Sequence, residues 1–325
     1  MLCLFYITKA PKAISFSIYK TVYKTCKNLP KSVYYRQKIY NIMEKSKCLF
    51  LFAGYDKEGI VDDALIYYVS NLAKIGDVVV CMDCDCEKSE IDKLKPFAIH
   101  TIAQRHGEYD FGSYKRAYQY AKDKDILKNY DYVYLVNDSV FGPMFDMTKI
   151  FTKMEQTNKD AVGLVVSKHK THTFMESWFV QLNKKIFTSD WFDEFISNVQ
   201  REDYKFIITV KYEHGLTNLI RQNKCSFDGI YHINGRKTYN QPKSLFRHGC
   251  PFVKKLSFTR HNGALGGQIK YILKRGDKNA IKSVITTANR IYGKKYMDWF
   301  LTSNPIKILC RNIKYGLKKL RSGEI

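Results

Sequence analysis

No apolar run in the sequence reaches the ~18 residues that a membrane-spanning helix needs, which favours a soluble or peripheral protein. The first ten residues are apolar, but no basic segment precedes them, and Lys9 and Lys12 interrupt the stretch. We therefore expect no signal peptide. No internal repeat and no low-complexity linker is visible in the sequence.

The cysteines lack the spacing of a zinc module. There are nine, an odd number, and the closest group is Cys81, Cys84 and Cys86. No second CxxC and no His pair follows at a zinc-binding distance. We interpret the cysteines as reduced thiols of a cytosolic protein.

Acidic residues are scarce. The chain of 325 residues has 31 Asp and Glu against 54 Lys and Arg, a formal net charge of +23. This balance predicts a polyanionic neighbour, which can be a nucleic acid, an anionic membrane surface or a phosphorylated substrate. Apolar residues make up 45% and charged residues 26%, which is ordinary globular usage and excludes wholesale disorder, collagen and a disulfide miniprotein.

The middle of the chain alternates short apolar runs with segments of helical periodicity. This alternation predicts βαβ units and an α/β fold with a mixed, mostly parallel sheet. The expected strands are Cys48–Ala53, Asp77–Met82, Phe97–Ala103, Tyr132–Val136 and Ala161–Val166. The expected helices are Val61–Lys74, Ser89–Lys95, Phe111–Lys122 and Met147–Met154.

Both ends of the chain differ from the middle. Residues 1–46 contain a single acid, Glu44, and residues 261–325 intersperse apolar positions with Lys and Arg. We expect two basic helical extensions around a central domain of residues 47–260. Basic amphipathic helices bind anionic membrane surfaces, but a solvated basic face over an ordinary core helix explains the same pattern.

Polar residues follow three of the expected strands, where α/β proteins bind their ligands. They are Tyr55-Asp56, the stretch from Arg105 to Ser113, and Asn137-Asp138-Ser139. Together they suit a nucleotide and a divalent metal such as Mg²⁺ or Mn²⁺. However, Asn137-Asp138-Ser139 supplies one carboxylate where a DxD motif has two, and Asp138 can equally cap a turn.

Two further segments have a structural and a functional interpretation. The backbone amides from Tyr109 onward, with Lys115 and Arg116, can face a phosphate at a helix start, yet Asp110 or Ser113 can simply cap that helix. Glu213 stands at the expected start of another helix. It can be a favourable charge beside the helix dipole or a general base near an acceptor hydroxyl.

Residues 47–260 resemble the rhamnan synthesis protein F family of bacterial polysaccharide glycosyltransferases. The order and spacing of five blocks carry the resemblance: Tyr55–Asp63, Tyr109–Lys115, Leu135–Pro143, Tyr212–Thr217 and Gly249–Lys254. The resemblance implies a GT-A-like nucleotide-sugar domain at the cytoplasmic face of the inner membrane. It also implies transfer of a sugar, often rhamnose from dTDP-rhamnose, to a lipid-linked or growing glycan.

Carried over by position, the resemblance assigns roles to particular residues. Glu213 is the expected catalytic base, and Asp138 the metal ligand. His248 is a third ligand or a structural histidine. Lys254, Lys255 or Arg247 can neutralise the leaving diphosphate in place of a metal. The expected nucleotide-sugar contacts are Tyr55, Asp56, Asp110, Phe111, Gly112, Ser113, Lys115, Asn137 and Ser139.

Two alternatives from other classes stay open. The positive charge, with 24 Tyr and 20 Phe, would suit nucleic-acid binding, although no helix-turn-helix, zinc-finger or RNP signature is present. A catalytically inactive scaffold of a polysaccharide assembly complex would explain the incomplete acidic motif, and it predicts no binding of a nucleotide sugar.

Overall fold

The computed structural model describes residues 46–169, 172–259 and 264–322. Residues 47–325 group into one compact unit, and all the described helices and strands belong to it. The expected N-terminal extension lies outside the described residues except for Ser46, and the expected boundary at 260/261 also falls outside them.

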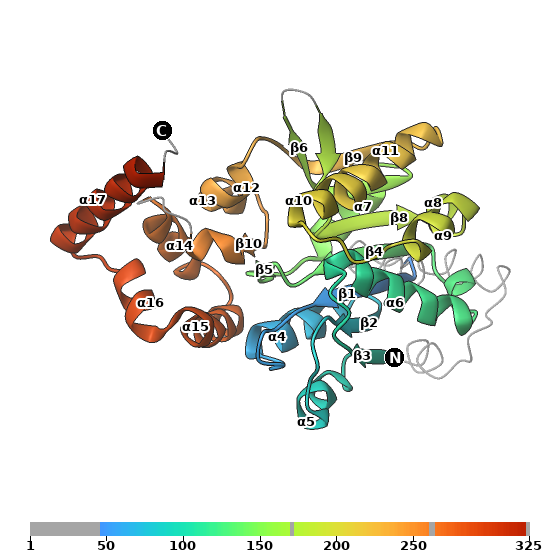
Figure 1. Cartoon of the computed structure of the whole chain (residues 1–325), viewed down its shortest axis with the longest axis horizontal. Coiled ribbons are helices and arrows are strands. Elements are labelled where there is room, and N and C mark those ends of the chain that lie inside the picture. The colour runs from blue at the N-terminus through green and yellow to red at the C-terminus, as the bar shows by residue number, and fades with distance from the viewer. Residues whose placement is uncertain (1–45, 170–171, 260–263, 323–325) are drawn as a thin grey trace, which may run out of the picture. The chain divides into compact units, whose positions relative to one another are not determined.

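An eight-stranded mixed sheet forms the centre of this unit (Figure 1). Its order is β3-β2-β1-β4-β8-β6-β7, and β9 pairs with β6. Only β7 and β8 run against the other strands of this sheet, which makes it mostly parallel. The strands are β1 (Cys48–Gly54), β2 (Asp77–Met82), β3 (His100–Ala103), β4 (Tyr132–Asn137), β6 (Ala161–Lys168), β7 (Thr173–Met175), β8 (Phe179–Asn183) and β9 (Phe227–Asn234).

Helices cover both faces of the sheet because its strands are apolar on both sides. In β1, Phe50 and Phe52 pack toward α4 (Asp63–Leu72) and α7 (Thr148–Gln156). Leu49 and Leu51 pack on the other face, whose helices are α6 (Tyr109–Asp123), α9 (Asp190–Ser197) and α11 (Gly215–Gln222). This α/β/α arrangement confirms the predicted fold class.

The expected strands and helices of the parallel half are present with small shifts at their ends. The short helix near residue 90 divides into α5 (Lys88–Ile91) and η1 (Asp92–Leu94). The pattern did not predict β7, β8 or β9. Strand β9 is partly exposed and carries polar residues among its apolar ones, because β6 is its neighbour on one side only.

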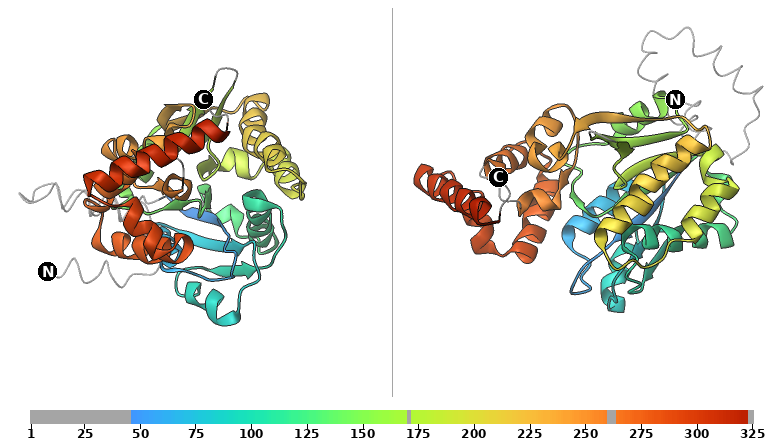
Figure 2. Two further views of the ribbon diagram at one scale, coloured as in Figure 1. Left: turned by 60° about the vertical axis from the view of Figure 1, so that its left-hand side comes forward. Right: turned by 45° about the horizontal axis from the view of Figure 1, so that its top comes forward.

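The chain from residue 237 onward builds most of a small core beside the sheet, to which Ala64, Phe141 and Met144 also contribute (Figures 1 and 2). Its centre includes Phe258, Leu265, Val284 and Phe300, and α15 packs against α4 of the main domain. Its elements are α12 (Lys237–Asn240), α13 (Pro242–Arg247), β10 (Val253–Lys254), η4 (Lys255–Phe258), α14 (Leu265–Leu273), α15 (Lys278–Tyr292), α16 (Lys294–Phe300) and α17 (Pro305–Ser322).

The predicted basic helix at the C-terminal end is confirmed as α17. Among the described residues, every helix is too short or too polar to cross a bilayer. The remaining short elements connect the larger ones: η2 (Leu127–Asn129), β5 (Val140–Phe141), α8 (Lys184–Phe187), α10 (Lys205–Ile208) and the π-helical segment η3 (Thr209–His214).

Candidate active site

Asn137 joins the ends of two strands to the start of a helix. It is the last residue of β4 and lies beside Ala53 of β1 in the sheet. Its side-chain amide donates to the Asp110 carboxylate at 2.8 Å, and its carbonyl oxygen accepts from the Ser139 hydroxyl at 2.6 Å. The sequence predicted contacts to the nucleotide-sugar donor for Asp110, Asn137 and Ser139. These three residues therefore meet at the carboxyl end of the sheet.

A small antiparallel pairing brings two lysines to the same place. Strand β10 pairs with β5, so Lys254 lies opposite Val140. The Lys254 ammonium donates to the Ser139 hydroxyl at 3.0 Å and lies 4.8 Å from the centre of the Trp178 ring. The Lys255 ammonium forms an ion pair with the Asp138 carboxylate at 3.0 Å. We call Asp110, Asn137, Asp138, Ser139, Ser177, Glu213, Lys254 and Lys255 the strand-end site.

Asp138 does not fit a divalent-metal site. Its carboxylate already has a lysine as counter-ion, and burial raises its pKa above the usual range although Lys255 opposes that effect. Within the described ranges, no group of three or more His, Cys, Asp and Glu side chains could hold a metal ion. A hard cation requires several oxygen ligands, and here a cationic side chain occupies the position beside the one carboxylate.

His248 lies at the end of α13, where its Nδ1 is 2.8 Å from the Ser244 carbonyl oxygen. Because a carbonyl only accepts, Nδ1 carries the proton and donates. The side chain is exposed and lines a pocket with Arg247. This geometry supports the structural interpretation of His248.

Glu213 lies inside a helical run, which corrects the expectation that a helix starts at this residue. The run passes through α10, the π-helical segment and α11 without a break. Every fourth residue of it is buried, namely Ile208, Tyr212, Leu216 and Ile220, so the packed stripe holds the whole run against the sheet. π-Helical turns frequently occur at functional sites, and this one contains Glu213.

The Glu213 carboxylate is held in place by one residue of the β7–β8 connection. One of its oxygens accepts from both the backbone amide and the hydroxyl of Ser177, each at 2.9 Å. Burial raises the pKa of Glu213, and the Ser177 hydrogen bonds and the charge of Lys254 offset only part of that rise. A carboxylate with a raised pKa, held beside a buried cation, is suited to accept a proton.

The start of α6 is packed into the protein core. Phe111 is buried against Tyr114 and Tyr212, and the Ser113 hydroxyl is 3.1 Å from the His106 ring. A side chain at Gly112 would collide with Glu108, since its Cβ would lie 2.2 Å from the Glu108 Cβ. Phe111, Gly112 and Ser113, which were expected in the donor loop, are thus packed in the protein and hold Asp110 in position to bond Asn137.

Lys115 also has protein partners. Its ammonium pairs with Glu108 at 3.1 Å and donates to the Val199 carbonyl oxygen. Glu108 also pairs with Arg116 at 2.7 Å. These cations hold the loop before α6, so phosphate binding by Lys115 would require it to leave both partners.

The loop after β1 carries Tyr55, which is 51% exposed and directly follows the last residue of that strand. The next residue is Asp56, and both of its carboxylate oxygens accept hydrogen bonds from the protein. One carboxylate oxygen accepts from the amides of Glu58 and Ile60, and the other from Arg290 of α15. Arg290 also bonds Asp62 at 2.9 Å.

Sequence reasoning missed several residues of this region. Arg290 and Ser177 had no local signal, because their partners are distant in the chain. Asp83 had a weak signal: it follows β2 and accepts from the amides of His106 and Gly107, both at 2.8 Å. An acid directly after an apolar strand was the pattern used for Asp56 and Asp138, and it applied equally to Asp83.

Solved structures with distant similarity include three nucleotide-handling proteins. A nucleotide-diphospho-sugar transferase from Desulfovibrio desulfuricans is 16% identical, with 78% of this chain and 99% of that chain covered and a TM-score of 0.35. A cytidylyltransferase from Leptospira borgpetersenii is 15% identical, with 71% and 94% covered and a TM-score of 0.33. Core-mannan synthase A from Aspergillus fumigatus, in its Mn/GDP form, is 12% identical, with 47% and 63% covered and a TM-score of 0.29.

No curated protein matches the chain. A family profile does match, under the description "Rhamnan synthesis protein F", and its match extends over residues 78–318. That range contains four of the five sequence blocks as well as Asn137, Glu213 and Lys254. Because the match spans most of the chain, this protein belongs to the rhamnan synthesis protein F family.

Proposed function

We propose that the protein is a glycosyltransferase that uses a nucleotide-sugar donor and inverts the anomeric centre. The family supports a glycosyltransferase. Rhamnose from dTDP-rhamnose is the donor that we propose, and a lipid-linked or growing cell-surface glycan is the acceptor. The observation that carries the proposal is the partly buried Glu213 carboxylate, which accepts two hydrogen bonds from Ser177, has a raised pKa and interacts with the charge of Lys254.

The reaction uses these two groups at opposite ends of the bond change. Glu213 takes the proton from the acceptor hydroxyl, and the oxygen forms a bond to the anomeric carbon of the donor. The bond from that carbon to the diphosphate breaks, and its electron pair leaves with the diphosphate oxygen. Lys254, supported by Lys255, stabilises the new negative charge. Asp110, Asn137 and Ser139 orient the donor. We assign the exposed Tyr55 ring as the surface that contacts the nucleobase of the donor.

The lysine pair has a consequence for the Mg²⁺ or Mn²⁺ expected from the sequence. Because the Asp138 carboxylate is paired with Lys255, no step is assigned to a metal ion. Lys254 is 6% exposed and lies between Ser139 and the Trp178 ring, so its charge is shielded from water and acts strongly on a nearby diphosphate.

The test is nucleotide release from a panel of nucleotide sugars by the purified full chain, with Mg²⁺ or Mn²⁺ and with a chelator. We expect release from one donor, persisting in the chelator and falling about 10²–10³-fold in Lys254→Gln. Lys282→Gln, an exposed lysine on α15, is the matched control. If folded protein neither binds nor turns over any donor, the scaffold alternative gains support.

We further propose that α17 holds the protein at the cytoplasmic face of the membrane. Its inner face carries the buried Arg311, which donates to the Phe300 carbonyl oxygen, and the buried Tyr315. Its outer face exposes Ile306, Leu309, Ile313 and Leu317, which are 71%, 60%, 54% and 52% exposed. The helix has no acidic residue. An apolar stripe among cations suits the surface of an anionic bilayer.

A further inference from the structure

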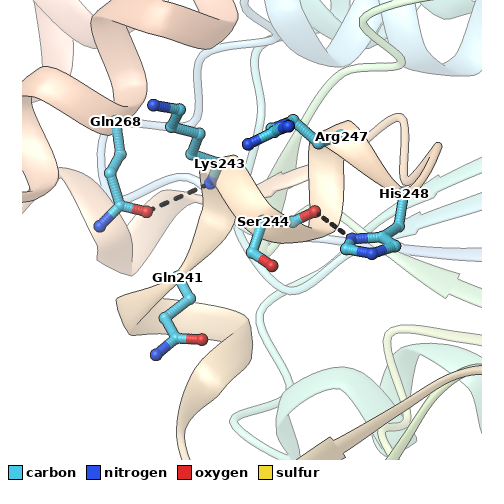
Figure 3. A pocket seen from close by; sticks show the side chains of 6 residues that line it. All are labelled: Gln241, Lys243, Ser244, Arg247, His248 and Gln268. Atoms are coloured by element: carbon cyan, nitrogen blue, oxygen red, sulfur yellow. Dashed lines mark hydrogen bonds between the residues drawn. The ribbon is translucent and has the colours of Figure 1, made fainter.

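An open pocket of about 490 Å³ lies between α13 and α14, and none of the residues that line it belongs to the strand-end site (Figure 3). Six residues line it: Gln241, Lys243, Ser244, Arg247, His248 and Gln268. Pockets for small molecules usually have ~300–1,000 Å³, so this one has room for a group larger than a single phosphate.

The lining is cationic. Lys243 and Arg247 are basic, the other four lining residues are polar, and none of the six is acidic. Among the described residues, neither Lys243 nor Arg247 has a carboxylate partner within ion-pair distance. The Lys243 ammonium instead lies 4.5 Å from the centre of the Tyr271 ring. Two cations without an acidic partner beside one pocket favour an anionic ligand.

The polar framework of the pocket is braced. The Gln268 side-chain oxygen accepts from the Lys243 backbone amide at 3.3 Å (Figure 3). The Gln268 side-chain nitrogen donates to the Asn240 carbonyl oxygen at 3.0 Å, and the two bonds tie α14 to α12 and α13. The Nδ1 of His248 donates to the Ser244 carbonyl oxygen, which leaves Nε2 as the nitrogen available to a ligand. A braced wall lowers the ordering cost of binding.

A short stretch of chain connects the pocket to the proposed reaction centre. Tyr239, which precedes Gln241 by two residues, has its ring centre 5.8 Å from the Lys254 ammonium. The Ser257 hydroxyl donates to the Tyr239 carbonyl oxygen at 2.9 Å. The wall of the pocket is thus anchored beside the lysine to which we assign the leaving diphosphate.

We propose that this pocket binds a phosphate or diphosphate group of the acceptor, separately from the donor nucleotide. The proposal rests on the proposed function only in identifying the ligand as the acceptor. Arg247 and Lys243 bind the phosphoryl oxygens, and Ser244 and Gln241 add hydrogen bonds. A phosphorylated acceptor held here is recognised by its charged end.

The test is calorimetric titration of the full chain with inorganic pyrophosphate, carried out in the Lys254→Gln background so that the strand-end site contributes little. We expect binding that weakens about tenfold or more in Lys243→Gln/Arg247→Gln, because each removed charge takes a charge-assisted hydrogen bond with it. Lys278→Gln/Lys282→Gln on α15 removes two exposed lysines outside the pocket and should leave the affinity within about twofold.

Equal weakening in the pocket and control variants would show a general charge effect and overturn the proposal, as would the absence of pyrophosphate binding. Farnesyl diphosphate is the second probe. Tighter binding than pyrophosphate, lost in the pocket variant, assigns a lipid-borne diphosphate, and equal binding assigns a water-soluble one. If no nucleotide is released but pyrophosphate binding still depends on Arg247, the proposal of glycosyl transfer is refuted. The proposal that the pocket binds a phosphate group is then retained.

Discussion

Glu213 shows how burial can prepare a residue for chemistry. Its carboxylate is desolvated, and desolvation disfavours the charged form. Two hydrogen bonds from Ser177 and the positive charge of Lys254 oppose that effect without cancelling it. A base whose pKa lies closer to neutrality takes a proton from a hydroxyl more readily than an ordinary glutamate does.

Glu213→Gln should lower turnover about 10²–10⁴-fold, the usual contribution of a general base, with little change in donor binding. In the parent protein, turnover should fall as the pH drops through the raised pKa of Glu213, and this acid limb should lie above that of an ordinary glutamate. The measurement is the pH profile of kcat, with the exposed Glu194→Gln as the control.

The same substitution has a stability signature. A carboxyl whose folded pKa is raised binds a proton more tightly in the folded state, so its ionised form destabilises the fold above that pKa. Glu213→Gln should therefore leave Tm at pH 7 unchanged or higher. A large fall in Tm together with lost turnover would point to a structural role and contradict the assignment of Glu213 as the base.

At the scale of elements, α15 fixes the loop after β1. Arg290 bonds Asp56, Asp62 and Glu58, and Asp62 also caps α4 by accepting from the Leu65 amide at 2.9 Å. Burial acts to raise the pKa of Asp56, but Arg290 and two backbone amides outweigh it, and the pKa is lowered. The C-terminal helices thereby hold the loop that carries Tyr55.

Arg290→Met should cost about 1–3 kcal/mol in the free energy of unfolding at pH 7, because it removes charged hydrogen bonds to partly buried carboxylates. A depressed pKa contributes stability that is present above the unfolded value of 3.8 and is lost as the pH falls through the folded value. The cost should therefore shrink in acid. Denaturant unfolding at pH 7 and pH 3 measures it.

Lys282→Met, on the exposed side of the same helix, is the control and should change stability by less than about 0.5 kcal/mol. A cost for Arg290→Met that stays constant with pH would mean that packing of the arginine stem, rather than its ion pairs, holds α15 to the loop.

At the scale of the whole molecule, the net charge of +23 and the outer face of α17 act together. Cations draw the protein to an anionic surface, and apolar side chains insert once it is there. In Ile306→Ser/Leu309→Ser, binding to vesicles containing phosphatidylglycerol should weaken about tenfold or more, because each apolar side chain contributes about 1.5–3 kcal/mol when buried.

Vesicle flotation measures this binding, and Ile285→Ser/Ile291→Ser on α15, where the two isoleucines are 37% and 41% exposed, is the control. Neutral vesicles and high salt should both weaken binding, since salt screens surface charges over about 10 Å. Binding that survives the α17 substitutions would place the membrane contact elsewhere or show that the stripe has a protein partner.

Local sequence patterns were enough to predict the parallel half of the sheet, its covering helices and the C-terminal basic helix. Those elements have strong periodic patterns, and a strand such as Cys48–Gly54, apolar throughout, must be covered on both faces. The residues after β1 and β4 were also predictable as site candidates, because parallel strands end at a common edge.

What those residues face depends on tertiary contacts that no local pattern encodes. The pairing of β10 with β5 brings Lys254 and Lys255 to Ser139 and Asp138 over more than a hundred residues of chain. As a result Asp138, the predicted metal ligand, forms an ion pair with Lys255. Ser177, Arg290 and the pocket of α13 and α14 likewise depend on contacts between distant segments. A local pattern records which face of an element is buried, but the partner that buries it is set by the fold.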